Sequence, residues 1–269
     1  MSVLEFTILG CGSSGGVPRA DGAWGACDPQ DPRNRRSRCS LLVRRRSVDG
    51  PEHETTVLVD TSPDLRLQTA AAAVRRVDAV LLTHDHADQT HGVDDLRAFA
   101  IRNRRRTPCY MDDATERSMM RRFGYIFRGE TGYPAICEAR SLPAFGVDWR
   151  IEGPSGDVPV ATFDQDHGGV RSIGYRFGAV AYSSDVVDLP PETIDALAGL
   201  KVWVVDALRY QPHPTHAHLG KTLEWIAAVK PERAILTNMH IDLDYATLAA
   251  QLPPGVEPAY DGMTFEVGG

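Results

Sequence analysis

Short apolar runs separated by turn residues dominate the chain and predict many β-strands. Residues 3–10 (VLEFTILG) end in glycines, which predicts a strand that runs into a turn. Similar runs predict strands at 39–46, 55–60, 77–83, 147–153, 158–164, 170–177, 179–185, 200–207 and 233–239. Strand runs occur in both halves, and each half ends in helical patterns. An α/β fold with two packed sheets and helices outside them satisfies this order.

Helical patterns are found at 62–76, 93–103, 112–127, 190–199, 219–231 and 244–252. In the first of these, Ser62 is expected as the N-cap and Pro63 as the first helical residue. Residues 107–150 give the least defined pattern. We find no internal repeat and no low-complexity linker, so we expect residues 1–269 to form one domain.

One long segment, residues 10–40, is rich in Gly, Pro, Asp and Arg and predicts neither strands nor helices. A loop of that length within a compact domain is usually functional. It begins with GCGSSGG, which is not a P-loop because no GK[ST] follows. Its backbone N–H groups are expected to face a phosphate or a metal site, and we expect Ser13 and Ser14 to support that site.

The composition narrows the class of protein. Apolar residues make up 42% of the 269 residues, and 29 basic against 36 acidic residues give a net charge of −7. This balance argues against long nucleic acid as a partner. No apolar run approaches the roughly 20 residues that cross a bilayer, and the N-terminus does not resemble a signal peptide. Five scattered cysteines without a CxxC pair fit a reducing, cytoplasmic location.

Residues 81–92, LLTHDHADQTHG, contain three of the nine histidines of the chain. His84, His86 and Asp88 alternate directly after a predicted strand. On a helix, positions two residues apart lie on different faces, whereas on an extended segment every second side chain points the same way. We therefore expect these three side chains to converge on one spot. Nitrogen and carboxylate ligands suit zinc and also accept manganese or iron.

Three further residues occupy the same kind of position, at the end of a predicted strand. They are His167, Asp185 and His240. Two metal ions bridged by a carboxylate would stabilise the attacking and leaving oxygens of a displacement at phosphorus. A water bound to such a metal acts as hydroxide near neutral pH. The pattern therefore predicts a hydrolase that uses two divalent ions, zinc or manganese.

The HxHxD motif followed by a distant His, Asp and His resembles the metallo-β-lactamase superfamily. ILGCGSSGGVP (8–18), LVDTSPDLRLQ (58–68), THDHADQTHGVDDLR (83–97) and ILTNMHIDLDY (235–245) are similar to its phosphoribosyl 1,2-cyclic phosphodiesterase branch. The resemblance implies a four-layer αββα sandwich. It also implies that His84, His86 and His167 hold one metal, that Asp88 and His240 hold the second, and that Asp185 bridges them.

The chain departs from the family motif HxHxDH at Gln89, where the family has a second-site histidine. An amide oxygen is a weaker ligand than imidazole for zinc-like ions. The second metal is therefore expected to be weakly bound unless His91, two residues further on, replaces the missing imidazole.

Other residues are expected to act around the metals. His216 matches a family histidine that serves as general acid or phosphate contact, and Asp88 is the second catalytic candidate. Asp60 resembles the family aspartate that orients a metal-binding histidine. His218 is a weaker candidate for a substrate contact. The resemblance thus implies a metal-dependent phosphodiesterase acting on a small cyclic phosphate or nucleotide-like ester.

Several alternatives remain open at this point. One is a tRNA-processing nuclease of the same superfamily, and another is a β-lactamase or thioester hydrolase. A third is an accessory or ligand-binding protein whose site Gln89 has impaired. The sequence also leaves open whether the chain is a monomer or a homodimer.

Overall fold

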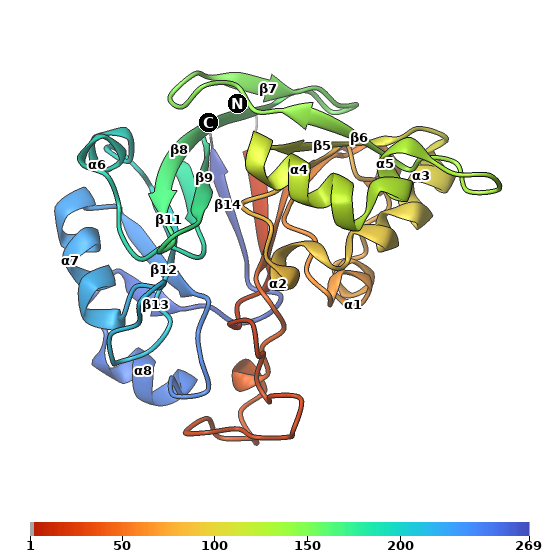
Figure 1. The fold of residues 1–269 in the computed structure, drawn as a ribbon. Helices are drawn as coiled ribbons and strands as arrows, with labels where there is room; N and C mark the ends of the chain where they lie inside the picture. Colours follow the sequence, from red (N-terminus) through yellow and green to blue (C-terminus); the bar gives the residue numbers. More distant parts are fainter. Residues whose placement is uncertain (1–2, 269) are drawn as a thin grey trace.

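The computed structural model describes residues 3–268, and these form two seven-stranded β-sheets that pack face to face (Figure 1). The first sheet has the strand order β14-β1-β2-β3-β4-β5-β6 and the second has the order β13-β12-β11-β10-β9-β8-β7. The first consists of β1 (Val3–Gly10), β2 (Ser40–Arg45), β3 (Thr55–Val59), β4 (Ala79–Leu81), β5 (Thr107–Met111), β6 (Cys137–Ser141) and β14 (Thr264–Gly268). The second consists of β7 (Trp149–Ile151), β8 (Val158–Asp166), β9 (Arg171–Phe177), β10 (Val180–Ser183), β11 (Val202–Asp206), β12 (Arg233–Thr237) and β13 (Val256–Pro258).

Helices cover the outer face of each sheet, which gives four layers (Figure 1). The first sheet carries α1 (Leu65–Ala71), α2 (Ala87–Thr90), α3 (Leu96–Asn103), α4 (Asp113–Arg122) and α5 (Gly124–Arg128). The second carries α6 (Pro191–Ala196), α7 (Leu219–Val229) and α8 (Tyr245–Gln251). The predicted α/β sandwich is confirmed. Within residues 3–268, none of these helices is long and apolar enough to cross a bilayer.

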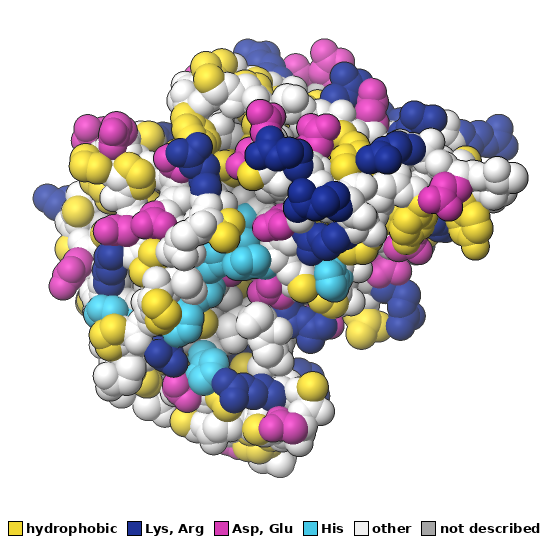
Figure 2. Space-filling model, viewed as in Figure 1, with side chains coloured by type: hydrophobic (Ala, Val, Ile, Leu, Met, Phe, Trp, Pro, Cys, Tyr) yellow, Lys and Arg dark blue, Asp and Glu magenta, His cyan; other side chains and the backbone are white. Residues whose placement is uncertain are grey.

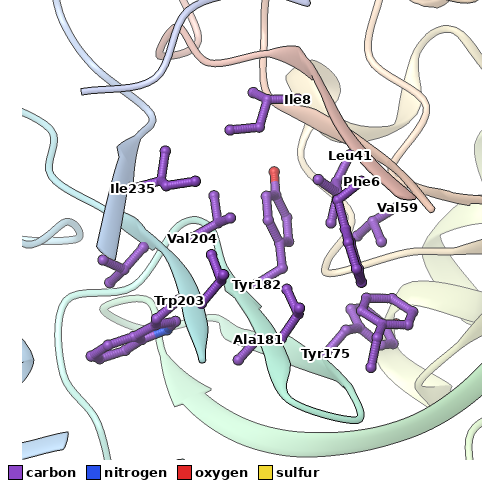
Figure 3. Packing of buried hydrophobic residues seen from close by; sticks show 14 of the residues in the cluster. Phe6, Ile8, Leu41, Val59, Tyr175, Ala181, Tyr182, Trp203, Val204 and Ile235 are labelled. Carbon is purple, nitrogen blue, oxygen red and sulfur yellow. The ribbon is translucent and has the colours of Figure 1, made fainter. Parts of the chain in front are cut away.

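The interface between the sheets is the main apolar core (Figure 3). Phe6 of the first sheet packs edge-on against Phe177 of the second, with ring centroids 6.0 Å apart. Trp203 is fully buried and donates its indole N–H to Ser183 Oγ at 2.9 Å. A second cluster lies between the first sheet and its helices. These two clusters make the sheets a rigid frame for the loops at their edge.

Parallel strands run through half of each sheet. Strands β3 to β6 are parallel to one another, and so are strands β10 to β13. In such sheets, the loops that follow the carboxyl ends of the strands gather at one edge and form the usual ligand site. The segments that carry His84, Asp185 and His240 follow β4, β10 and β12.

Helix α1 is shorter than the predicted span of 62–76. Its N-cap is Asp64, and Ser62 instead accepts the Asp64 N–H on its hydroxyl at 3.1 Å. At the other end Ala73 has a left-handed φ of 51°, and Arg44 donates to the carbonyl of Ala72 at 3.1 Å. Alanine favours helix, so the alanine run by itself would continue α1. The helix ends here because the backbone turns at Ala73 and Arg44 binds the carbonyl of Ala72.

The predicted helix over 112–127 is two helices, because Phe123 leaves helical geometry at φ −128° and ψ 27°. The sequence pattern also missed strands β5, β6, β13 and β14. Each has five residues or fewer and includes proline, glycine or charged side chains, so its pattern is weak. Neighbouring strands supply the hydrogen bonds that hold these segments extended.

The long segment 10–40 folds over the edge of the two sheets and joins them. Arg36, although charged, is 2% exposed, and its Nη2 donates to the carbonyl of Leu243 at 2.7 Å. Asn34 donates to Asp244 Oδ2 at 2.7 Å. The segment is therefore anchored to the loop after β12, beside the predicted site.

Candidate metal centre

Three histidines from two sheets meet at the edge of the sandwich. His84 and His86 follow β4, and His167 follows β8. The ring of His84 lies 4.5 Å from that of His86 and 4.9 Å from that of His167, between centroids. One nitrogen from each ring lies within 4.8 Å of the others. In Figure 2, histidine side chains gather in a hollow on this face, with arginines at its rim.

Hydrogen bonds orient the ring of His84. Thr83 Oγ1 lies 2.9 Å from Asp60 Oδ2 and 3.0 Å from His84 Nδ1. When an ionised Asp60 accepts the hydroxyl proton, Thr83 Oγ1 accepts the Nδ1 proton of His84, and Nε2 keeps its lone pair. Burial raises the pKa of Asp60, and a cation at His84 would oppose that rise. Asp60 thus acts on His84 through Thr83.

His84 Nε2 is buried and has no hydrogen-bond partner within residues 3–268. Burial lowers the pKa of His84 to about 3, so the ring is neutral near pH 7. His167 donates its Nδ1 proton to the carbonyl of Thr215 at 2.7 Å, which leaves its Nε2 lone pair 3.3 Å from His86 Nδ1. Ring nitrogens of three histidines that lie within 4.8 Å of one another fit a bound zinc-like cation.

Asp185 lies beside these histidines in an unusual backbone conformation. It has a left-handed φ of 55° and is 2% exposed. One of its carboxylate oxygens lies within 4.8 Å of a ligand nitrogen of His167 and of His216. Burial alone would raise the pKa of Asp185, but the neighbouring histidines, among them the protonated His216, and the Ser184 hydroxyl lower it below its usual range. An ionised carboxylate is therefore available at this point of the site.

His216 reaches the site from the loop after β11. Its Nδ1 lies 3.0 Å from Asp206 Oδ2, at the end of that strand, and its Nε2 faces Asp185 Oδ1 at 3.9 Å. Burial disfavours the charged ring, but Asp206 outweighs burial and raises the pKa of His216 to about 9. The ring is therefore an imidazolium near neutral pH and a proton donor.

Asp88 requires a correction to the predicted geometry. The chain is extended only as far as His86, which is the N-cap of α2, so Asp88 lies in a helical turn. It therefore does not continue the alternation of His84 and His86. Burial and the negative charge of Asp185 raise the pKa of Asp88 to about 6. The carboxyl group is half-buried and lines a cavity of about 590 Å³.

The structure places three other histidines differently from the prediction. His240 follows β12, but its Nε2 contacts the guanidinium of Arg19 and its Nδ1 lies 3.0 Å from Asp242 Oδ2. His91 is exposed and packs against the ring of Phe123, so it does not replace the imidazole missing at Gln89. His218 is the N-cap of α7 and accepts the Lys221 N–H, which gives it a structural role.

The two serines of the glycine-rich loop differ in position. Ser13 is buried, and its N–H donates to the carbonyl of Met239 at 3.2 Å. Ser14 is exposed and lines the same cavity as Asp88, together with Arg19 and Arg38. Only Ser14 is open to a ligand.

Sequence reasoning missed Thr83, Thr215, Asp206 and Arg19. Asp206 ends a strand in the same way as the recognised candidates, so its position was a usable signal. Thr215 acts through its backbone carbonyl, which leaves no trace in the sequence. Arg19 lies in the long loop, and no spacing rule connects it to His240.

Comparisons with known proteins agree with this geometry. Residues 55–241 match the family described as beta-lactamase superfamily domain. An octanoyltransferase of Porphyromonas gingivalis (strain ATCC BAA-308 / W83) is 30% identical over 268 residues, which cover 97% of this chain and 51% of that protein. The chain thus spans about half the length of this curated relative, and the transferase name describes the longer protein.

Solved structures give closer matches in length. A diphosphatase from the PhnP family is 32% identical, with a TM-score of 0.85 over 98% of this chain and 97% of the other. Zn²⁺-bound PqqB from Methylobacterium extorquens is 19% identical, with a TM-score of 0.70 over 97% and 99% of the two chains. The short form of human tRNase Z is 12% identical, with a TM-score of 0.65 over 97% and 98%. The last two show a shared fold alone.

Proposed function

Because the chain belongs to the PhnP-like branch of the metallo-β-lactamase superfamily and is a metal-dependent hydrolase, we propose that it hydrolyses a small cyclic phosphate or nucleotide-like phosphodiester. The observation that supports this substrate class best is the pairing of His216 with Asp206. A proton donor beside a metal centre suits a reaction in which an alkoxide leaves phosphorus.

His84, His86 and His167 would hold a divalent ion. Bound there, the ion supplies Lewis acidity and positive charge toward phosphate oxygens. Two residues of the chain then carry out one proton transfer each. The Asp88 carboxylate accepts a proton from the water that attacks phosphorus, and His216 Nε2 donates a proton to the leaving oxygen as the P–O bond breaks. The products are a phosphomonoester and a free hydroxyl group.

Asp206 positions His216 and keeps it protonated. Asp206 does not face the substrate directly. Its role is to place the Nε2 proton beside Asp185, where the leaving oxygen would be.

The direct test is hydrolysis of bis(p-nitrophenyl) phosphate and of a panel of cyclic phosphates with added Zn²⁺ or Mn²⁺. We expect turnover by the wild type and none by His84→Ala. His53→Ala, which changes an exposed histidine in a short 3-10 helix, is the matched control and should behave as wild type. Metal-loaded protein that leaves every phosphodiester intact would refute the proposed substrate class.

A further inference from the structure

Asp185 and His240, two of the residues expected to bind a second metal, are already engaged with hydrogen-bond donors. Gln89 Nε2 donates to Asp185 Oδ2 at 2.9 Å, and the hydroxyl of Ser184 donates to the same oxygen. A metal ligand must offer a lone pair, and an amide N–H offers none. Gln89 therefore turns its N–H donor toward Asp185, and its only lone pairs belong to the buried Oε1, a weaker ligand for zinc-like ions than the imidazole that the family has there.

His240 is engaged in the same way. Arg19 Nη2 donates to His240 Nε2, and Asp242 Oδ2 lies 3.0 Å from Nδ1 of the same ring. The Nε2 lone pair is thus directed at a guanidinium, which is permanently charged. A divalent ion bound at His240 would have to displace Arg19 or lie beside its positive charge.

The glycine-rich loop explains how Arg19 reaches this position. The stem of Arg19 packs along the loop at Gly15, where a Cβ atom would make ordinary van der Waals contact with Arg19 Cγ at 3.5 Å and with its Nε at 3.6 Å. The loop is tied to the strand end before His240 by two backbone hydrogen bonds. These run from Met239 N to the carbonyl of Cys11 (2.9 Å) and from Ser13 N to the carbonyl of Met239 (3.2 Å).

Arg19 is also open to an anion. It is exposed and lines the cavity of about 590 Å³ that Asp88 borders. Within the part of the chain that the structure describes, Arg19 has no carboxylate partner, whereas Arg38 on the same cavity pairs with Asp64 at 3.0 Å. A guanidinium that keeps free N–H groups beside a metal centre suits a phosphate oxygen.

We propose that this chain holds a single metal ion, at His84, His86 and His167, and that the guanidinium of Arg19 takes the place of the second cation and binds a phosphate oxygen of the substrate. The metal count stands on the contacts of Gln89 and Arg19. The contact between Arg19 and the substrate rests on the proposed function.

Metal stoichiometry tests the first part without any assay of activity. We expect zinc titration followed by native mass spectrometry to show one ion per chain for wild type and for Arg19→Gln. The double variant Gln89→His/Arg19→Gln restores the imidazole and removes the guanidinium, so it should hold two. Two ions in the wild type, or one in the folded double variant, would overturn this part.

Inorganic phosphate tests the second part, again without turnover. Calorimetric titration of zinc-loaded protein should show phosphate binding weakened by roughly ten- to a hundredfold in Arg19→Gln, the loss expected for a charged hydrogen bond. Arg19→Lys should recover part of it. Arg150→Gln, on β7 with a side chain 74% exposed, is the matched control. Equal phosphate affinity in wild type and Arg19→Gln would refute the contact.

The two tests keep this proposal separate from the proposed function. One zinc per chain and Arg19-dependent phosphate binding, found in a protein that cleaves no phosphodiester, would support the single-metal inference and refute the proposed phosphodiesterase function. Turnover of phosphodiesters by a protein that holds two ions per chain would support the proposed function and refute the single-metal inference.

Discussion

His216 Nδ1 lies 3.0 Å from Asp206 Oδ2, and this contact joins the end of strand β11 to the loop that follows it. The carboxylate raises the pKa of His216 to about 9 despite the cost of burial. The raised pKa determines how the stability of the fold depends on pH. The charged ring stabilises the fold fully below the ordinary pKa of about 6.5, and this contribution is lost as the pH rises through about 9.

The first prediction concerns this pair. Asp206→Asn removes the negative charge that keeps His216 protonated, so the alkaline fall in kcat/KM should move to lower pH. In the wild type we expect that fall near pH 9. The measurement is a pH–rate profile of both proteins at saturating metal. An alkaline limb at the same pH in both would show that His216 is not the proton donor.

The second prediction concerns Thr83, which connects Asp60 with His84. Thr83→Val keeps the shape of the side chain but removes the hydroxyl between them, so His84 loses its orienting partner. Loss of such a partner typically weakens metal binding by about 10- to 100-fold. Competition with a chromophoric chelator measures the affinity. Thr162→Val is the matched control, because the Thr162 hydroxyl is buried without a hydrogen-bond partner inside residues 3–268.

The third prediction concerns metal removal. Ring nitrogens of His84, His86 and His167 lie within 4.8 Å of one another in the folded chain, so a cation should bind it far better than the unfolded one. Zinc at 100 times its Kd should raise the free energy of unfolding by about 2.7 kcal/mol. Thermal denaturation with and without zinc shows this as a rise in Tm. The rise should vanish in His84→Ala; if it persists there, the stabilising site lies elsewhere.

The fourth prediction concerns Asp244, which anchors the long loop. Its carboxylate accepts from Asn34 Nδ2 at 2.7 Å and from the N–H of Thr247 at 2.9 Å, where it caps α8. Burial opposes ionisation, but these donors prevail and lower the pKa of Asp244. Its contribution to stability is therefore present above the ordinary pKa of 3.8 and is lost as the pH falls toward the lowered value.

Asp244→Ala should cost about 0.5–2 kcal/mol of unfolding free energy at pH 7, the usual range for a lost N-cap. Urea denaturation at pH 7 measures the loss, and it should shrink at acid pH. Asp195→Ala, an exposed aspartate of α6, is the control. A loss that does not depend on pH would mean that the charge of Asp244 is not what holds the loop.

The sequence by itself determined the two-sheet architecture and the places where chemistry could be. Alternating and continuous apolar runs have the period of strands, so β1 to β4 and β7 to β12 are readable without a structure. His84 and His86 are also readable, because their spacing after a strand forces a shared direction. These are local properties, set within a few residues.

The tertiary structure decided which candidates meet. His216 joins Asp185 and His167, whereas His240 turns to Arg19, a residue 221 positions away in the chain. Asp88 leaves the extended pattern because α2 begins at Ala87, and His91 turns to Phe123. Such outcomes depend on loops that pack across the sheet edge and on backbone groups such as the Thr215 carbonyl. No periodicity encodes contacts of this kind, since their energy arises only when distant segments are already in place.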